Sequence, residues 1–460
     1  MKKILILLSF LMLVACSGSD DSPAPPPELP GEGGNPPTEP EEPVELSDEE
    51  LMDLVQERTF AYFWDFAETN SGGARERYIP ANPSQDANIV TSGGTGFGLM
   101  SILVGIERGY ISRGEGFQRI TKIVDFLENA DRFHGAWPHW MEGATGNVIP
   151  FSDLDDGGDL VETALLVQGL ICVQEYFNTG STEEANLASK VESLWKGVEW
   201  NWYSQNQNVL YWHWSPNNDF AINLPLKGWN ETLITYVLAA ASPDFGIDKV
   251  VYDEGWASNG NIVSSGTQYS IPLLVKHGGN ANETGPLFFA HYSFLGLNPN
   301  GLSDQYANYL DVNKNHSLIN YSYCVDNPKG FTDYGENCWG LTASYTRNND
   351  GGLGYSAHSP SNDLGVISPT AAISSIPYTP EESLAAMQFF YGIEDILLGP
   401  AGFYDAFSPQ NNYWVGEAYL AIDQGPQIIM IENYRSGLLW DLFMKNEDVK
   451  NGLDRLGFSY

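Results

Sequence analysis

The chain has 460 residues, of which 42% are hydrophobic and 13% aromatic, so it can bury a large core and a disordered or fibrous protein is excluded. Its 59 acidic and 22 basic residues give a formal net charge of −37 at pH 7. Because such a surface repels phosphate groups, we expect no nucleic-acid partner.

The N-terminus carries an export pattern. Lys2 and Lys3 precede an apolar run over residues 4–14, which is too short to cross a bilayer as a permanent helix. The pattern is similar to a bacterial lipoprotein signal, in which residues 1–15 are removed and the freed Cys16 carries lipid. The alternative is an ordinary secretory signal that happens to contain a cysteine. We expect an exported lipoprotein, anchored to the outer membrane on its periplasmic or surface face and touching the membrane only through the lipid.

Residues 16–45 are rich in Pro, Gly, Ser and acids, a composition that cannot bury a core, so we expect a flexible tether. The folded domain is then expected over residues 46–460. Its first helix is predicted to begin at Ser47, an N-cap candidate with Glu50 three positions later, as in a capping box.

Helical patterns follow one another along this domain, with few strand-like alternations between them. Helices are predicted at residues 47–68, 95–109, 115–130, 159–177, 182–203, 231–241, 285–295, 303–311, 338–346, 380–398 and 426–446. Some of these are amphipathic, whereas the stretches 95–105 and 160–173 are apolar nearly all round.

This alternation of exposed and buried helices predicts an all-α fold, an (α/α)6 toroid with roughly six inner and six outer helices. A plain helical bundle is the alternative. Long segments rich in Gly, Asn, Trp and Tyr, at residues 206–229, 247–284 and 347–379, are expected to build one rim of the toroid. Loops of this length are more often functional than idle.

A carboxylate cluster containing Asp155, Asp159 and Glu162 leads into one of the buried helices. An EF-hand calcium loop is excluded, because counting from Asp153 puts Gly157 at the fifth position, where an oxygen ligand is required. Asp159 followed by Glu162 also fits a helix cap. Catalysis is the other interpretation. Repulsion between neighbouring carboxylates raises the pKa of one of them, and the carboxyl that stays protonated can then act as a general acid.

Glu231 opens another short apolar helix, and aromatic residues lie near it in the sequence. A first-turn Glu that stabilises the helix dipole is one interpretation. A carbohydrate site is the other, since sugar rings stack on indoles and their hydroxyls need polar partners. The candidate substrate-binding residues are Trp137, His139, Trp140, Trp212, Trp214 and Trp229. For any single tryptophan, packing in the core is the alternative.

Two further candidates, Asp405 and Asp423, stand in the C-terminal part of the chain. Asp405 lies in an aromatic turn, and Asp423 precedes Pro426, which we expect at the first position of a helix. Acyl transfer is disfavoured because no G-x-S-x-G elbow occurs. No metal site and no cofactor are expected, since CxxC and HExxH motifs are missing. Whether Cys324 and Cys338 form a disulfide stays open.

Several stretches together resemble the glucoamylase-like family of bacterial glycoside hydrolases, whose characterised members cleave β-1,2-glucans. These stretches are DGGDLVETALLVQGL (156–170), GWNETL (228–233), ENCWGLTAS (336–344), SPTAAISSIPYTPEE (368–382), GFYDAF (402–407) and AIDQGPQIIMIENYRSGLLW (421–440). The likeness covers nearly the whole chain after the tether. It implies an (α/α)6 toroid, an inverting mechanism, and either endo cleavage or release of sophorose from chain ends.

The resemblance also implies that the acids Asp155, Asp159, Glu162 and Glu231 line the cavity. Glu336 and Tyr378, which lie within two of the shared stretches, join the candidate substrate-binding residues, as do Asp405 and Asp423. The β-1,2 linkage rests on the resemblance alone.

An inverting glycosidase needs one protonated carboxyl and one carboxylate that activates water, roughly 6.5–9.5 Å apart. Glu231 is the predicted general acid, because a lone acid among tryptophans is poorly hydrated and its pKa is raised. Asp159 or Glu162 is the predicted base, with Asp155 orienting it. Two acids are held in reserve as the base, Asp405 and Asp423.

The expected partner is a glucan or oligosaccharide substrate, and three alternatives are kept. A tethered glycan-binding protein would use the tryptophans without a matched pair of acids. A polysaccharide lyase would need Arg or Lys against a uronate carboxylate, which this acidic chain supplies poorly. A true glucoamylase would act on α-glucans. Endo or exo action and the oligomeric state stay open.

Overall fold

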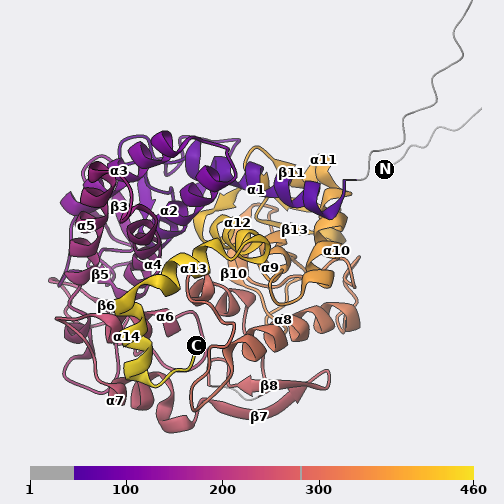
Figure 1. Cartoon of the computed structure of the whole chain (residues 1–460). Helices are drawn as coiled ribbons and strands as arrows, with labels where there is room; N and C mark the ends of the chain where they lie inside the picture. The colour runs from indigo at the N-terminus through magenta and orange to yellow at the C-terminus, as the bar shows by residue number, and fades with distance from the viewer. Residues whose placement is uncertain (1–45, 280–281) are drawn as a thin grey trace, which may run out of the picture. The chain divides into compact units, whose positions relative to one another are not determined.

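The computed structural model describes residues 46–279 and 282–460 (Figure 1). The expectations for the leader, Cys16 and the tether fall on residues 1–45 and therefore lie outside the described residues. Leu46–Tyr460 cluster as one compact unit, and every element below belongs to it.

The fold is mostly helical. Its α-helices are α1 (Asp48–Trp64), α2 (Ser92–Glu107), α3 (Arg113–Asn129), α4 (Leu160–Phe177), α5 (Thr182–Lys196), α6 (Leu233–Ala241), α7 (Lys249–Val251), α8 (Tyr309–Asp326), α9 (Pro369–Ile373), α10 (Pro380–Tyr391), α11 (Glu394–Leu397), α12 (Ala421–Arg435), α13 (Leu438–Lys445) and α14 (Glu447–Leu456). Figure 1 shows α2, α4, α6 and α12 toward the middle of the view, with α1, α3, α5, α14, α8 and α10 around them.

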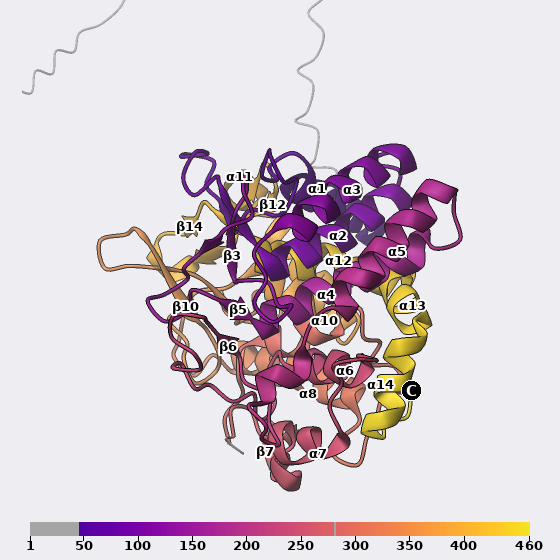
Figure 2. The ribbon, with the colours of Figure 1, turned by 90° about the vertical axis from the view of Figure 1, so that its left-hand side faces the viewer.

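The strands are short and pair in twos and threes. They are β1 (Arg77–Tyr78), β2 (Ile89–Thr91), β3 (Trp140–Glu142), β4 (Val148–Ile149), β5 (Gly158–Asp159), β6 (His213–Trp214), β7 (Val263–Gln268), β8 (Ile271–Val275), β9 (Ala343–Arg347), β10 (Leu353–Ala357), β11 (Leu398–Gly399), β12 (Gly402–Phe403), β13 (Ala406–Ser408), β14 (Trp414–Gly416) and β15 (Tyr419–Leu420). Figure 2 shows β3, β5, β6, β10 and β14 on the same side of the domain.

The first helices follow the sequence prediction within a few residues. The capping box of α1 is confirmed, since Glu50 Oε2 accepts a hydrogen bond from the Ser47 N–H at 2.9 Å and Ser47 Oγ accepts one from the Glu50 N–H at 3.3 Å. The all-round apolar stretches become α2 and α4, which are buried along nearly their whole length. By length and composition α4 could cross a membrane, but 89% of it is buried inside the domain, as a core helix requires.

Later predictions were less accurate. Residues 338–346 do not form a helix; they lead into β9, which pairs with β10 in a hairpin. The helix predicted at 303–311 begins only at Tyr309, and 285–295 forms two 3-10 turns, η4 (Leu287–Ala290) and η5 (Tyr292–Phe294). These segments are short and mix polar with apolar residues, so periodicity alone does not separate strand, turn and helix in them, which explains these errors.

The helix predicted to start at Pro426 begins at Ala421 instead. Pro426 therefore lies inside α12, and Asp423 lies in its first turn rather than on a rim ahead of it. Of the predicted rim segments, 347–379 supplies Tyr355 to the cavity described below, whereas the described residues of 206–229 and 247–284 supply none of its lining residues.

Glycine lets α2 and α4 approach each other closely. A Cβ on Gly96 would lie 2.3 Å from the Leu165 carbonyl oxygen, and one on Gly169 would lie 2.2 Å from the Gly96 carbonyl oxygen. Both distances are far inside van der Waals contact, so the two backbones touch only because these side chains are hydrogen atoms. The contact packs the first turns of α2 against the middle of α4.

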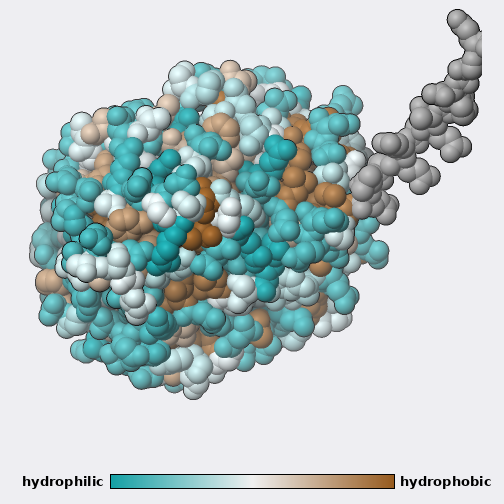
Figure 3. Space-filling model, turned by 45° about the horizontal axis from the view of Figure 1, so that its top comes forward, coloured by the Kyte–Doolittle hydropathy of each residue, from teal (hydrophilic) through white to brown (hydrophobic). Residues whose placement is uncertain are grey.

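The three cysteines among the described residues, Cys172, Cys324 and Cys338, are free thiols and are buried. The face of the domain in Figure 3 is mainly hydrophilic, with hydrophobic side chains in separate patches.

Candidate active site

Carboxyl groups and aromatic rings meet at a cavity of about 440 Å³, a size typical of small-ligand sites. Its wall is formed by β1, β3, β9, β10 and β15 and by residues at the starts of α2, α4, α6 and α12. The lining residues are Glu76, Arg77, Thr91, His139, Trp140, Phe151, Glu162, Glu231, Phe288, Tyr292, Tyr345, Tyr355, Leu420 and Ile422. Helix N-termini carry a partial positive charge, so this wall favours carboxylates and polar oxygens.

Glu162, in the first turn of α4, is held by the start of α2. Its Oε2 accepts hydrogen bonds from the Gly93 N–H at 2.8 Å and from Thr91 Oγ1 at 3.3 Å. A Cβ on Gly93 would lie 2.5 Å from the same oxygen, so only glycine allows this contact. Burial raises the pKa of Glu162 above its usual value, and the Asp159 charge adds to the rise, while the nearby His139 cation, the Gly93 N–H and the Thr91 hydroxyl only partly oppose it.

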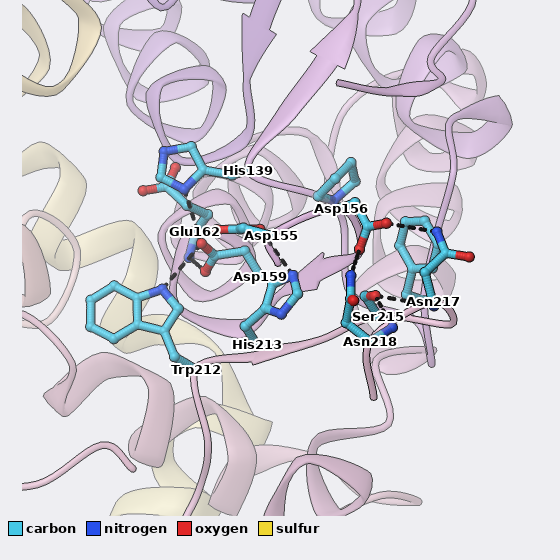
Figure 4. Close-up of polar contacts among 12 residues, drawn as sticks. His139, Asp155, Asp156, Asp159, Glu162, Trp212, His213, Ser215, Asn217 and Asn218 are labelled. Atoms are coloured by element: carbon cyan, nitrogen blue, oxygen red, sulfur yellow. Dashed lines mark hydrogen bonds and ion pairs between the residues drawn. The ribbon is translucent and has the colours of Figure 1, made fainter. Parts of the chain in front are cut away.

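Asp159 is the N-cap of α4 and is fully buried. Its Oδ1 accepts the N–H groups of Val161 and Glu162 at 3.0 and 2.9 Å. Its Oδ2 lies 3.0 Å from His139 Nδ1 and accepts the Trp212 indole N–H at 3.1 Å (Figure 4). The capping interpretation is therefore correct for Asp159, and both of its oxygens are occupied by protein donors.

His139 is a cation in this site. Burial lowers its pKa, but Glu162, Asp159 and Asp155 raise it more, to about 9. The ring stacks on Phe151 with centroids 4.1 Å apart. His139 therefore carries a positive charge at neutral pH that balances part of the carboxylate cluster.

Asp155 lies beside the same cluster, with its Oδ1 2.9 Å from His213 Nε2. The ligand atoms of His139, Asp155 and Asp159 lie within 4.8 Å of one another, close enough to surround a metal ion. The protonated His139 and the four hydrogen-bond donors on Asp159 describe an ion-pair network instead, because a metal ligand must offer a free lone pair.

Glu231 lines the cavity just before α6, and its carboxylate has no basic partner among the described residues. Burial, and then the charges of Glu162 and Asp159, raise the pKa of Glu231 to about 7, and a backbone hydrogen bond only partly opposes the rise. Glu231 and Glu162 thus share one cavity but differ in their surroundings, since of the two only Glu162 lies beside a cation, His139.

Asp405 and Asp423 form a second carboxyl pair next to the cavity wall, and each is 2% exposed. Asp405 Oδ2 accepts the Tyr345 N–H at 2.6 Å, and Asp423 follows the wall residue Ile422. Burial raises the pKa of Asp405 to about 6, and burial together with the Asp405 charge raises that of Asp423 well above its usual range. Carboxyls this close hold a proton between them at neutral pH.

The predicted aromatic residues divide into three groups. His139 and Trp140 line the cavity. Trp212 supports Asp159 through its indole N–H, and Trp214 packs against His134 and Trp202 away from the cavity lining. Substrate contact is corrected for Trp137 and Trp229, which are fully buried core residues.

Two further predicted contacts are corrected. Glu336 is exposed in a loop and is not among the cavity-lining residues. Tyr378 is buried, and its hydroxyl donates to the Ala290 carbonyl oxygen at 3.0 Å and accepts from Asn313 Nδ2 at 3.2 Å. Because these protein partners use its hydroxyl, Tyr378 is a structural residue.

Sequence reasoning missed much of the wall. The pair Glu76–Arg77, whose side chains contact each other, lines the cavity, and in a chain with only 22 basic residues an arginine beside an acid was a usable signal. Tyr292 and Tyr345 offered no such signal, since they lie in segments predicted as helices, whereas Tyr355 lies in a segment predicted as a functional rim but was not singled out within it.

A mostly helical fold with two carboxyls of raised pKa in an aromatic-walled cavity is typical of glycoside hydrolases that use acid–base catalysis. The Glycoamylase family model matches residues 223–447. An endo-β-1,2-glucanase from Chitinophaga pinensis, solved with sophorotriose and glucose, is 55% identical, with a TM-score of 0.87 over 90% of this chain and 99% of that one. The chain therefore belongs to the glucoamylase-like family, as the shared sequence stretches indicated.

A second relative is the exo-β-1,2-glucooligosaccharide sophorohydrolase (non-reducing end) of Parabacteroides distasonis, 43% identical over 89% of this chain. The chain spans 58% of the length of that relative. An endo-β-1,2-glucanase from Talaromyces funiculosus has a TM-score of 0.63 at 12% identity over 89% of this chain and 91% of that one, a likeness of fold alone.

Proposed function

We propose that this chain is an inverting glycoside hydrolase that cleaves β-1,2-glucan or its oligosaccharides, with Glu231 as the general acid. One observation carries the proposal. Two carboxyls share one cavity, and the pKa of Glu231 is raised to about 7, so its proton is available near neutral pH. The pKa of Glu162 is also raised by burial, but the His139 cation and the donors of Gly93 and Thr91 favour its ionised form.

In this mechanism Glu231 donates its proton to the departing glycosidic oxygen. Glu162 takes a proton from the attacking water, so that the hydroxyl enters from the opposite face of the sugar. Glu162 is preferred over Asp159 as the base because it lines the cavity, whereas both oxygens of Asp159 are engaged in capping α4 and binding His139 and Trp212. Asp155 supports the cluster from behind, and Asp405 with Asp423 remains the alternative source of the base.

The finer architecture proposed is the (α/α)6 toroid. The central placement of α2, α4, α6 and α12 and the gathering of helix starts at the cavity support it. The β-1,2 linkage is supported by the two bacterial relatives, one described as an endo-β-1,2-glucanase and the other as an exo-acting sophorohydrolase.

The test is to incubate the protein with β-1,2-, β-1,3- and α-1,4-glucans, chromatograph the products over time and read the anomeric configuration of the first product by NMR. We expect hydrolysis of the β-1,2-glucan with inversion. Sophorose alone would indicate exo action, and a range of lengths endo action. Preference for the α-1,4-glucan would instead identify a true glucoamylase, binding without reducing-sugar release a glycan-binding protein, and an unsaturated, ultraviolet-absorbing product a lyase.

Variants separate the roles of the two acids. Glu231→Gln should lower kcat about 10²–10⁴-fold, the usual contribution of general acid catalysis. Glu162→Gln should do the same and should also remove the acid limb of the pH profile. If Asp423→Asn removes that limb while Glu162→Gln keeps it, the base is Asp423.

We also propose that the chain is anchored through Cys16 in the outer membrane. The sequence of residues 1–16 supports this anchoring. Labelled palmitate should be incorporated into the wild type and not into Cys16→Ser, and the wild type should fractionate with outer membranes. Unlabelled wild type in the soluble fraction would contradict the anchor.

A further inference from the structure

Three buried hydrogen-bond donors in the cavity wall have no partner among the residues that the structure describes. The hydroxyls of Tyr292 and Tyr345 and the indole N–H of Trp140 are buried and make no hydrogen bond with any described residue. All three side chains line the cavity that holds Glu162 and Glu231. Tyr292 and Tyr345 are each 5% exposed, so bulk water does not replace the missing partners freely.

Other buried tyrosines in the described chain use their hydroxyls within the protein. Tyr62 donates to the Arg75 carbonyl oxygen, Tyr236 to that of Leu226, and Tyr323 to Asp363 Oδ2, at 2.7 to 3.0 Å. Leaving a buried polar group unpaired costs free energy, so natural folds rarely do it without a functional reason. Among the described tyrosines, only Tyr110 also has a buried hydroxyl without a hydrogen-bond partner, and Tyr110 lines a different cavity beside α1.

Both orphan hydroxyls are rigidly held. The Tyr292 ring lies between Phe97 and Phe288, with centroids 5.5 and 5.0 Å away, and its carbonyl oxygen accepts Gln168 Nε2 at 3.0 Å. Tyr345 sits in β9 opposite Tyr355, and its N–H is bound by Asp405. Binding a ligand there therefore costs little ordering of the side chains.

The surroundings decide which ligand atoms these donors suit. Burial, and then the charges of Asp423, Glu231 and Glu162, raise the pKa of Tyr292 well above its usual range, so its hydroxyl stays protonated at any working pH. A charged ligand is a poor match, because it would either pair with the acids or need more cations than Arg77 and His139 supply. A neutral hydroxyl group suits the tyrosine donors and the carboxylates together, since its oxygen accepts from a tyrosine while its O–H donates to a carboxylate. A pyranose hydroxyl is such a group.

We propose that Tyr292 and Tyr345, assisted by Trp140, are specificity-determining residues that donate hydrogen bonds to ring hydroxyls of the glucosyl unit bound between Glu162 and Glu231. This inference rests on the proposed function and deepens it. A site built to bond a substrate hydroxyl discriminates strongly against ligands that lack it, because its own donor is then left unpaired. The unpaired donors therefore destabilise the free protein, and they form their hydrogen bonds when the substrate binds.

The inference predicts an unusual pair of effects. Tyr292→Phe and Tyr345→Phe keep the rings and remove only hydroxyls that have no protein partner, so Tm should stay unchanged or rise. Each should lower kcat/KM on β-1,2-glucan about tenfold, the value of one hydrogen bond near the upper end of the neutral range. The matched control Tyr323→Phe breaks its bond to Asp363 outside the cavity, so Tm should fall and kcat/KM should hold.

The experiment measures Tm and kcat/KM for these variants and, by calorimetry, the binding of sophorotriose to Glu231→Gln with and without Tyr292→Phe. The added Tyr292→Phe change should weaken that binding about tenfold. Kinetics within twofold of the wild type in both cavity variants would overturn the inference, as would a loss of Tm like that of Tyr323→Phe. A wild type inactive on β-1,2-glucan would instead overturn the proposed function.

Discussion

Glu231 combines a functional role with a cost to stability. Its pKa is raised to about 7 in the folded protein, so the folded state binds this proton more tightly than the unfolded state. The stability that the proton contributes is complete below the unfolded pKa of about 4.5 and is lost as the pH rises through about 7. Ionisation of Glu231 therefore lowers the free energy of unfolding at alkaline pH.

The first prediction follows from this loss of stability with rising pH. Glu231→Gln should raise Tm relative to the wild type at pH 8 and change it little at pH 5, while kcat/KM of the wild type should fall as the pH rises above about 7. Thermal melts at the two pH values and a pH–rate profile check it. The exposed Glu417→Gln serves as control and should show no such pH dependence. An equal Tm gain at both pH values would contradict a proton held by Glu231.

Gly93 offers a second prediction, because it lets the Glu162 carboxylate reach the start of α2. A Cβ there would lie 2.5 Å from Glu162 Oε2, so Gly93→Ala should displace the carboxylate. A misplacement of 1 Å at a catalytic group can cost about 10²-fold in rate, and we expect a loss of kcat of that order. The control is Gly98→Ala on the same helix, where the nearest atom is a movable Phe63 ring carbon at 3.0 Å. Similar losses of kcat in both variants would show that α2 is merely disturbed.

At the scale of elements, the close approach of α2 and α4 sets the position of Glu162. Gly96→Ala would push a Cβ to 2.3 Å from the Leu165 carbonyl oxygen, so the helices must separate. We expect a loss of about 1–3 kcal/mol in the free energy of unfolding, as for overpacked cores. Gly114→Ala in α3 is the matched control, since its Cβ meets nothing within 4 Å. It should stabilise by about 0.5–1 kcal/mol. Denaturant melts measure both values, and equal changes of one sign would refute the packing argument.

The elements also show what the sequence could predict. α2 and α4 were predictable because apolar residues around the whole helix, with small residues among them, have few explanations other than a buried helix. β9 was not, since its five residues, of which four are buried, carry no decisive period. Asp159, Glu162 and Glu231 were noticed because acids stand at the starts of apolar helices.

The rest of the site depends on contacts between distant segments. Tyr292 and Tyr345 are separated by more than fifty residues, and nothing local distinguishes them from core tyrosines such as Tyr323. Their significance is an unpaired hydroxyl in a cavity, which exists only after the chain has folded. In the same way, tryptophan is a residue type on which sugar rings stack, but Trp137 and Trp229 are fully buried in the core.

For the whole molecule, the unit Leu46–Tyr460 contains all the described residues that line the cavity and the described buried hydrophobic residues that form its core. The capping box at Ser47 and the bond from Gln388 Nε2 to the Leu46 carbonyl oxygen fix the start of this unit locally. Folding and catalysis should therefore need nothing from residues 1–45.

The last prediction is that residues 46–460, produced alone, fold with the Tm of the Cys16→Ser chain and cleave β-1,2-glucan with kcat/KM within about twofold of it. Stability and chemistry depend on burial and on the cavity, and both lie inside the unit. A further truncation to residue 51 tests the boundary, since it removes Ser47 and Glu50 and should cost about 1 kcal/mol or more through loss of the cap. Melting curves and initial rates on the same substrate measure all three proteins. A clear loss of kcat/KM on removing residues 1–45 alone would mean that the N-terminal segment contributes to the active site.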